Sequence, residues 1–109
     1  MIILTYDKPT DVGRVRRELH DLRGRNLSMR FHFPNGRTET MSGLLEPTDD
    51  GDFSLREPWV EVPFQRNVVL QVANLRGFDY SKGRLAEDEA MRVEIEPNMA
   101  FPDAQGRRE

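Results

Sequence analysis

Apolar and polar residues alternate strictly in the middle of the chain. Between residues 27 and 33 every second side chain is apolar, at Leu27, Met29, Phe31 and Phe33. A period of two is typical of a strand with one buried face. Asn35-Gly36 follows after a proline and tolerates the positive φ angles of a tight hairpin. The pattern therefore predicts a second, antiparallel strand from Thr38 to Leu45, with a bend or bulge at Gly43.

A helical period precedes this hairpin. Four apolar residues recur at spacings that place them on one helix face, namely Val12, Val15, Leu19 and Leu22. We expect a helix over about residues 10–23, with Thr10 as N-cap and Gly24 as its end. The opposite face carries charges whose i, i+4 spacing predicts two ion pairs, Arg14–Glu18 and Arg17–Asp21.

The remaining segments also read as short strands. Alternation resumes at Phe53 and Leu55 and continues over residues 60–64, where two prolines indicate an edge or a broken strand. Residues 67–72, 76–80 and 91–96 have the lengths and apolar content of further strands. The segment at residues 2–6 fits either a short strand or an arm that pairs with a neighbouring subunit. Residues 82–89 resemble a linker.

The predicted fold class is mainly β. We expect one domain over residues 1–96, a small barrel of about five strands preceded by one N-terminal α-helix. Residues 97–109 lack periodicity, which predicts a flexible, disordered C-terminal tail.

Composition narrows the class of protein. The 109 residues suffice for one core, which is thin because 37% of the residues are apolar and 32% are charged. Cores of this kind often gain stability from oligomerisation. Because no run of apolar residues is long enough for a signal peptide or a membrane span, we expect a soluble, cytoplasmic protein without a membrane partner.

Charge and cysteine content exclude several kinds of site. The chain has no cysteine, which excludes disulfides, thiolate nucleophiles and cysteine-bound metals. Its net charge of -3 argues against a surface that binds nucleic acid everywhere. Local basic patches remain compatible with this charge.

Several short motifs resemble those of Sm-like proteins, the ring-forming small barrels of RNA metabolism. The strand ending in Asn35-Gly36-Arg37 resembles the strand and turn of the family's first motif. Gly43-x-Leu45 resembles the Gly-x-Leu of its bent second strand, and Asp52-Phe53-Ser54-Leu55 its third-strand Asn-x-x-Leu. Residues 74–78, Asn-Leu-Arg-Gly-Phe, resemble the apolar-Arg-Gly of the second motif.

This resemblance covers roughly residues 11–80 and implies a ring whose pore holds Arg76 and Gly77 near a bound base or phosphate. Asp52, where the family has an RNA-contacting asparagine, would face Arg76 and repel phosphate. The simpler alternative is that Arg76 and Asp52 form an ion pair with each other. The interval between Gly36 and Gly43 is two residues longer than the family usually allows.

Residues for metal, cofactor or catalytic chemistry are sparse. The two histidines, His20 and His32, have no metal-ligand spacing, and the acidic residues 49–52 lack the later glutamate of a calcium loop. No glycine-rich phosphate loop and no serine in a nucleophile context is present. We therefore expect no metal, no cofactor and no enzymatic activity.

Two features remain as candidate contacts for a partner. Lys8 and the helix arginines, above all Arg14 and Arg17, form the one basic cluster, which either binds nucleic acid or protein or only solvates the helix. Trp59 lies in an irregular segment and is either an interface residue or half-buried core.

The sequence thus predicts a non-enzymatic binding or assembly module that forms a homo-oligomer, with a ring as the form that the resemblance implies, and binds a protein or RNA partner. A structural adaptor of a phage or mobile element is the alternative, and an enzyme of unrecognised type is the third.

Overall fold

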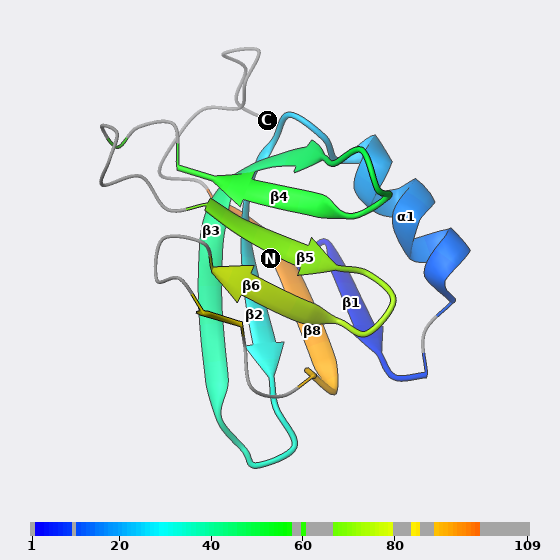
Figure 1. Ribbon diagram of the computed structural model, residues 1–109, viewed down its shortest axis with the longest axis vertical. Coiled ribbons are helices and arrows are strands. Elements are labelled where there is room, and N and C mark those ends of the chain that lie inside the picture. Colours follow the sequence, from blue (N-terminus) through cyan, green and yellow to red (C-terminus); the bar gives the residue numbers. More distant parts are fainter. Residues whose placement is uncertain are drawn as a thin grey trace.

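The chain folds around one long antiparallel sheet with a single short helix beside it (Figure 1). The computed structural model describes residues 2–9, 11–57, 60, 67–79, 84–85 and 89–98. Within them the strand order is β1-β8-β2-β3-β4-β5-β6-β7. The elements are β1 (Leu4–Asp7), α1 (Val12–Asp21), β2 (Asn26–His32), β3 (Thr38–Pro47), β4 (Phe53–Arg56), β5 (Asn67–Gln71), β6 (Arg76–Asp79), β7 (Arg84–Leu85) and β8 (Arg92–Pro97).

Helix α1 confirms the predicted helix, with a different cap. Val15 and Leu19 are fully buried and Leu22 nearly so, as the apolar spacing requires. The N-cap is Asp11, not Thr10: the Asp11 carboxylate accepts the Arg14 N–H at 3.1 Å. Aspartate accepts this bond as well as threonine does, so the helix begins one residue later than expected. Beyond its end, Gly24 has a φ of 80°.

The predicted hairpin is present in the predicted register. Leu27, Met29 and Phe31 are fully buried, while the residues between them face outward. In the loop, Gly36 has a φ of 85° and donates its N–H to the Phe33 carbonyl at 3.0 Å. Asn35 keeps a negative φ and accepts the Arg37 N–H through its side chain. Only one of the two turn residues therefore needs the left-handed conformation.

Strand β3 is shared between two neighbours. It pairs with β2 along residues 38–44 and with β4 along residues 44–47. Pairing with β4 begins just after Gly43, where a Cβ atom would lie 2.7 Å from the Arg56 backbone. On the other side Leu45 still exchanges hydrogen bonds with Gly24 and Arg25. The bend predicted at Gly43 thus has a cause, since only glycine lets the two backbones approach so closely.

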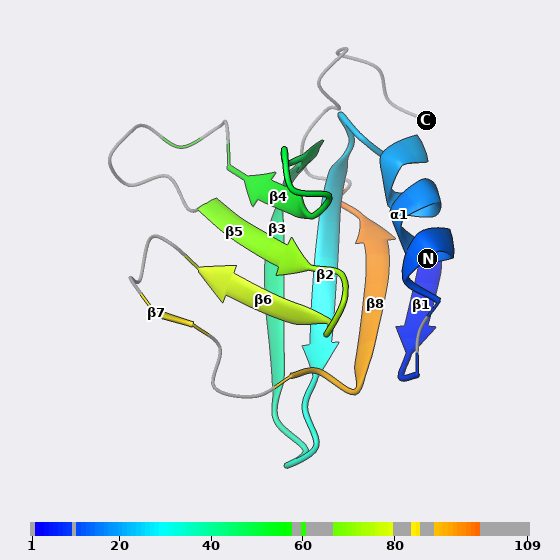
Figure 2. The ribbon, with the colours of Figure 1, turned by 45° about the vertical axis from the view of Figure 1, so that its right-hand side comes forward.

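The sheet coils so that β6 crosses over the hairpin (Figure 2). A Cβ atom on Gly77 would lie 3.0 Å from the Met41 sulfur and 3.2 Å from the Phe31 ring. Side chains from β2, β3, β4, β5 and β8 fill the space enclosed, together with Val15 and Leu19 of α1. The core therefore lies between the coiled sheet and the helix.

The sheet has more strands than the sequence predicted, eight instead of about five. Residues 2–6 contribute β1, which pairs with β8 of the same chain, so the alternative of an arm is not needed to explain them. Strand β6 is the strand predicted over residues 76–80, and β7, which lies in the segment interpreted as a linker, extends this edge of the sheet. Among the described residues the sheet stays open, with β1 and β7 at its two edges, and a closed barrel is not seen.

Strand β8 reaches the start of the predicted tail. Leu27 is the register partner of Pro97, and Asn98 donates its N–H to the Asn26 carbonyl at 2.9 Å. Residues 99–109 lie outside the described residues. Within the described part of the chain, no helix has the length and apolar character needed to cross a membrane.

The strand register gives a first prediction. Phe31→Ala should lower the free energy of unfolding by about 3 kcal/mol, because it leaves a cavity in the core. His32→Ala should change it by less than about 1 kcal/mol, because His32 faces outward and its 2.8 Å contact with Glu94 is partly exposed. Urea unfolding of both variants measures the difference, and a larger effect at His32 would contradict the register.

Two glycines with opposite surroundings give a second prediction. Gly43→Ala should destabilise the protein by roughly 3 kcal/mol, since the new methyl group meets the Arg56 backbone. Gly13→Ala on exposed α1 should instead stabilise it by up to about 1 kcal/mol, because alanine favours helix. Thermal unfolding of the pair tests this, and an unchanged Gly43→Ala variant would argue against the close approach of β3 and β4.

Candidate binding site

The residues singled out from the sequence lie in three separate places. Arg14 and Arg17 are on α1, and Asp52 ends the turn between β3 and β4. Lys8 follows β1, whereas Arg76 and Gly77 begin β6. Trp59 lies outside the described residues. Within the predicted basic cluster, Lys8 pairs with Glu89 and Arg14 with Glu18.

Arg14 is bound within the protein. Its guanidinium donates to Glu18 at 2.7 Å, which confirms one predicted helix pair, and lies 5.6 Å from the centre of the Tyr6 ring. The Tyr6 hydroxyl donates to the other Glu18 oxygen at 3.3 Å. Burial, and next the Glu18 charge, raise the pKa of Tyr6 well above its usual value. The contacts among Arg14, Glu18 and Tyr6 join α1 to β1.

Other helix cations also have partners on the protein. Arg16 donates from Nε to the Gly51 carbonyl at 2.8 Å and so holds the turn between β3 and β4. Arg23 donates to the His20 carbonyl at 2.8 Å near the end of the helix. Arg14 is thus paired with a carboxylate, and Arg16 and Arg23 each have a local carbonyl that orients the guanidinium.

Arg17 differs from these arginines. The predicted ion pair Arg17–Asp21 is not formed among the described contacts, although both side chains border the same surface depression. They border a shallow, open depression of about 390 Å³ together with Arg16 and His20. Two arginines and the Asp21 carboxylate border it, so the depression presents both signs of charge to a ligand.

Asp52 fixes the backbone of two strands. Its carboxylate accepts the Val72 N–H at 3.0 Å, beyond the end of β5, and its own N–H donates to the Thr48 hydroxyl at 3.1 Å. The ion pair between Asp52 and Arg76, one of the two alternatives drawn from the sequence, is not formed among the described residues. A carboxylate at this position serves the turn because it accepts a buried N–H.

The backbone at Arg76 is held in an unusual way. Leu75, which is 1% exposed, has a φ of 54°, a conformation rare for a residue other than glycine. The Asn74 side chain accepts the Arg76 N–H at 3.2 Å, and the Leu75 carbonyl accepts the Ala90 N–H at 3.3 Å. These contacts fix where the Arg76 side chain leaves β6.

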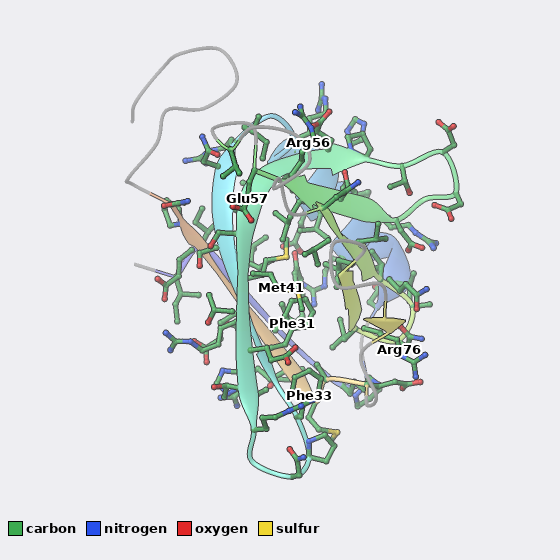
Figure 3. The ribbon with its side chains drawn as sticks, turned by 60° about the vertical axis from the view of Figure 1, so that its left-hand side comes forward. Phe31, Phe33, Met41, Arg56, Glu57 and Arg76 are labelled. Atoms are coloured by element: carbon green, nitrogen blue, oxygen red, sulfur yellow. The ribbon has the colours of Figure 1, made fainter. Side chains whose placement is uncertain are left out.

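Arg76 keeps donor capacity. Its Nε is buried and has no hydrogen-bond partner among the described residues, although the side chain as a whole is partly exposed. Figure 3 shows Phe31, Phe33 and Met41 projecting from β2 and β3 toward the side on which β6 lies. An apolar floor therefore lies below the strand that carries this guanidinium.

Glu89, whose carboxylate the charge of Arg76 also influences, already has a partner. Lys8 and Glu89 form an ion pair that joins the end of β1 to the segment before β8. The Lys8 hydrogen bond and charge, with a smaller contribution from Arg76, lower the pKa of Glu89 below its usual value. We call Lys8, Arg76 and Glu89 the Arg76 corner. These three described residues comprise two cations and one carboxylate, and Lys8 binds the carboxylate.

Sequence reasoning missed Glu89, which lies in the segment interpreted as a linker. Its partner Lys8 is 81 residues away, and no local pattern carries a contact at that separation. The described residues contain no group of three His, Cys, Asp or Glu side chains placed to hold a metal ion.

Comparisons with protein-family models, with curated proteins and with solved structures give no match to this chain.

The role of Asp52 can be tested by removing its carboxylate. Asp52→Ala should destabilise the fold by roughly 1–3 kcal/mol, because the Val72 N–H loses its acceptor. Asp52→Asn should restore most of the loss, since an amide oxygen also accepts this bond. Asp49→Ala, in the same turn but exposed, is the control and should change little. If urea unfolding shows equal effects of Asp52→Asn and Asp52→Ala, the negative charge of Asp52, and not its hydrogen bond to Val72, stabilises the fold.

Proposed function

We propose that this protein is a non-enzymatic binding and assembly module that self-associates and binds a protein partner through the Arg76 corner. One observation carries the proposal: the Arg76 guanidinium is partly exposed, and its buried Nε has no acceptor among the described residues. A guanidinium binds a carboxylate through parallel hydrogen bonds, and a carboxylate on the partner would bind the exposed donors of this group.

The distribution of charge favours protein over RNA. Arg14, Arg16 and Arg23 donate to acceptors of the chain itself, and Lys8 is paired with Glu89. Nucleic-acid binding needs several cations free to neutralise phosphates. The net charge of -3 also repels nucleic acid, which is a polyanion.

The architecture supports a proposed small barrel of the SH3-like or Sm-like kind, in which the strands after α1 coil around the core. Strand β3 is the second strand after the helix and bends at Gly43. Gly77 of β6 packs on Met41 and Phe31 from across the core. Small barrels of this kind bind partners through their loops and edges, and the Arg76 corner lies where one of these turns meets the start of β8.

A catalytic role has little support. Each histidine has a charged neighbour that engages its ring: His20 is 3.2 Å from Arg23, and His32 is 2.8 Å from Glu94. Within the described residues neither ring has a hydroxyl as hydrogen-bond partner, although Thr38 lies opposite His32 across the hairpin. We also propose a cytoplasmic location, because a chain without cysteine needs no oxidising compartment.

The test measures binding of two labelled probes, an oligo-glutamate peptide and a single-stranded RNA, at physiological salt. The wild-type protein should bind the peptide, and Arg76→Gln should weaken this binding about tenfold, because the paired donors are lost. Arg30→Gln is the matched control: Arg30 is an exposed arginine on the outer face of β2. Equal weakening by both variants would mean only general attraction between charges and would contradict the proposed site.

The RNA arm decides between the two classes of partner. We expect no micromolar affinity for RNA. Micromolar affinity that is abolished by replacing Lys8, Arg14 and Arg17 with glutamine would overturn the preference for a protein partner. The solution mass of the wild-type protein tests self-association separately.

A further inference from the structure

One half of strand β3 has a neighbour on one side only. Strand β4 pairs with β3 only from Leu44 onward, whereas β2 pairs with it from Thr38. Along residues 38–42 the side of β3 that faces away from β2 therefore has no strand beside it among the described residues. Figure 3 shows Arg56 of β4 near the upper end of β3, and the lower half runs on beyond it to the hairpin.

The hydrogen-bond pattern shows which groups face this open side. The Phe33 N–H donates to the Arg37 carbonyl, so odd-numbered residues of β3 face β2 and even-numbered ones face away. Leu44 and Glu46 confirm this alternation, since they are paired with Arg56 and Ser54 of β4. The main-chain N–H and C=O groups of Thr38, Thr40 and Ser42 are therefore left without a described partner.

This edge has few of the features that usually prevent strand pairing, and its one charged side chain is Glu39. Between Thr38 and Ser42 there is no proline, no lysine and no bulge, and the register with β2 is continuous. Threonine also favours extended backbone. In Figure 1 the lower half of β3 forms the left-hand boundary of the ribbon. An extended strand placed there would continue the sheet.

The edge is complementary to a second copy of itself in one register. Two antiparallel copies of β3 centred on Thr40 place Thr40 opposite Thr40 and Thr38 opposite Ser42. This uses every open main-chain group, in three pairs of two hydrogen bonds each. On the outer face, threonine and serine hydroxyls lie opposite each other, a favourable cross-strand pairing.

Neighbouring registers are worse. A two-fold axis at Glu39 would place two Glu39 carboxylates opposite each other, which is destabilising. An axis at Met41 would require Leu44 to pair across the dimer, and Leu44 already pairs with Arg56 of β4. In the register centred on Thr40, Glu39 lies opposite Met41 instead, so no like charges meet.

We propose that two copies of this chain associate through antiparallel pairing of residues 38–42 of β3 about a two-fold axis at Thr40. The inference rests on the proposed self-association and names its surface and symmetry. An interface related by a two-fold axis closes on itself and yields a dimer. The ring expected from the Sm-like resemblance would need a different contact.

The first experiment is Thr40→Pro in the full chain. Proline removes the N–H at the centre of the proposed pairing and no bond to β2, because that N–H faces away from β2. Sedimentation should show a wild-type dimer and a folded Thr40→Pro monomer. Thr5→Pro is the control: it places proline in the edge strand β1, at the other end of the sheet, and should remain dimeric.

The second experiment does not depend on tolerance of proline. The chain has no cysteine, so Thr40→Cys introduces a single thiol. Opposed residues in a hydrogen-bonded pair have Cα atoms about 5.5 Å apart, within the range of a disulfide. Mild oxidation at low concentration should give a cross-linked dimer of Thr40→Cys and little from Thr5→Cys.

The outcomes separate the two proposals. A wild-type oligomer whose mass is unchanged by Thr40→Pro, with no preferential cross-link at position 40, would overturn the β3 interface and leave self-association standing. A wild-type protein that is monomeric at all concentrations would overturn both. Preferential cross-linking of Thr5→Cys would assign the interface to β1.

Discussion

The close approach of β3 and β4 at Gly43 is the contact on which the rest of the fold depends. A side chain there would meet the Arg56 backbone at 2.7 Å, so only glycine allows β4 to approach β3 this closely. Strands β5 and β6 follow β4 in the sheet, and Gly77 of β6 lies against Met41 and Phe31. Because β4 pairs with β3 only from Leu44 onward, residues 38–42 have no described strand on that side.

The charged residues divide into those that hold the fold and those that remain available. Arginines of α1 bind the first strand, the turn at Gly51 and the helix end, and Asp52 binds the backbone at Val72. A thin core gains from such contacts because it buries little apolar surface. Arg76 differs from them, since hydrogen bonds around Leu75 hold its backbone while its Nε has no acceptor among the described residues. That contrast is the basis on which we propose it as a binding residue.

Local patterns predicted the helix and the hairpin because the information lies within a few residues. The alternation from Leu27 to Phe33 and the bend at Gly43 both follow from side-chain spacing and glycine. The pairing of β1 with β8 and the Lys8–Glu89 contact could not be predicted, because they join opposite ends of the chain. The same limit applies to the hydrogen bond between Asp52 and Val72, because β4 and β5 separate these residues in the sequence. Charge patterns predicted which residue types belong to the candidate site, but not which residues they contact.

The central position of β8 has a consequence for how the protein is made. Strand β2 has β3 on one side and β8 on the other, and β8 is the last strand of the described chain. Until residues 92–97 leave the ribosome, β2 and β1 lack their common neighbour. Contacts between such distant segments slow folding, since a long loop must close before they form. Through most of synthesis the sheet of the nascent chain therefore lacks β8. Because β8 is translated after the other described strands, it is the strand that completes the sheet.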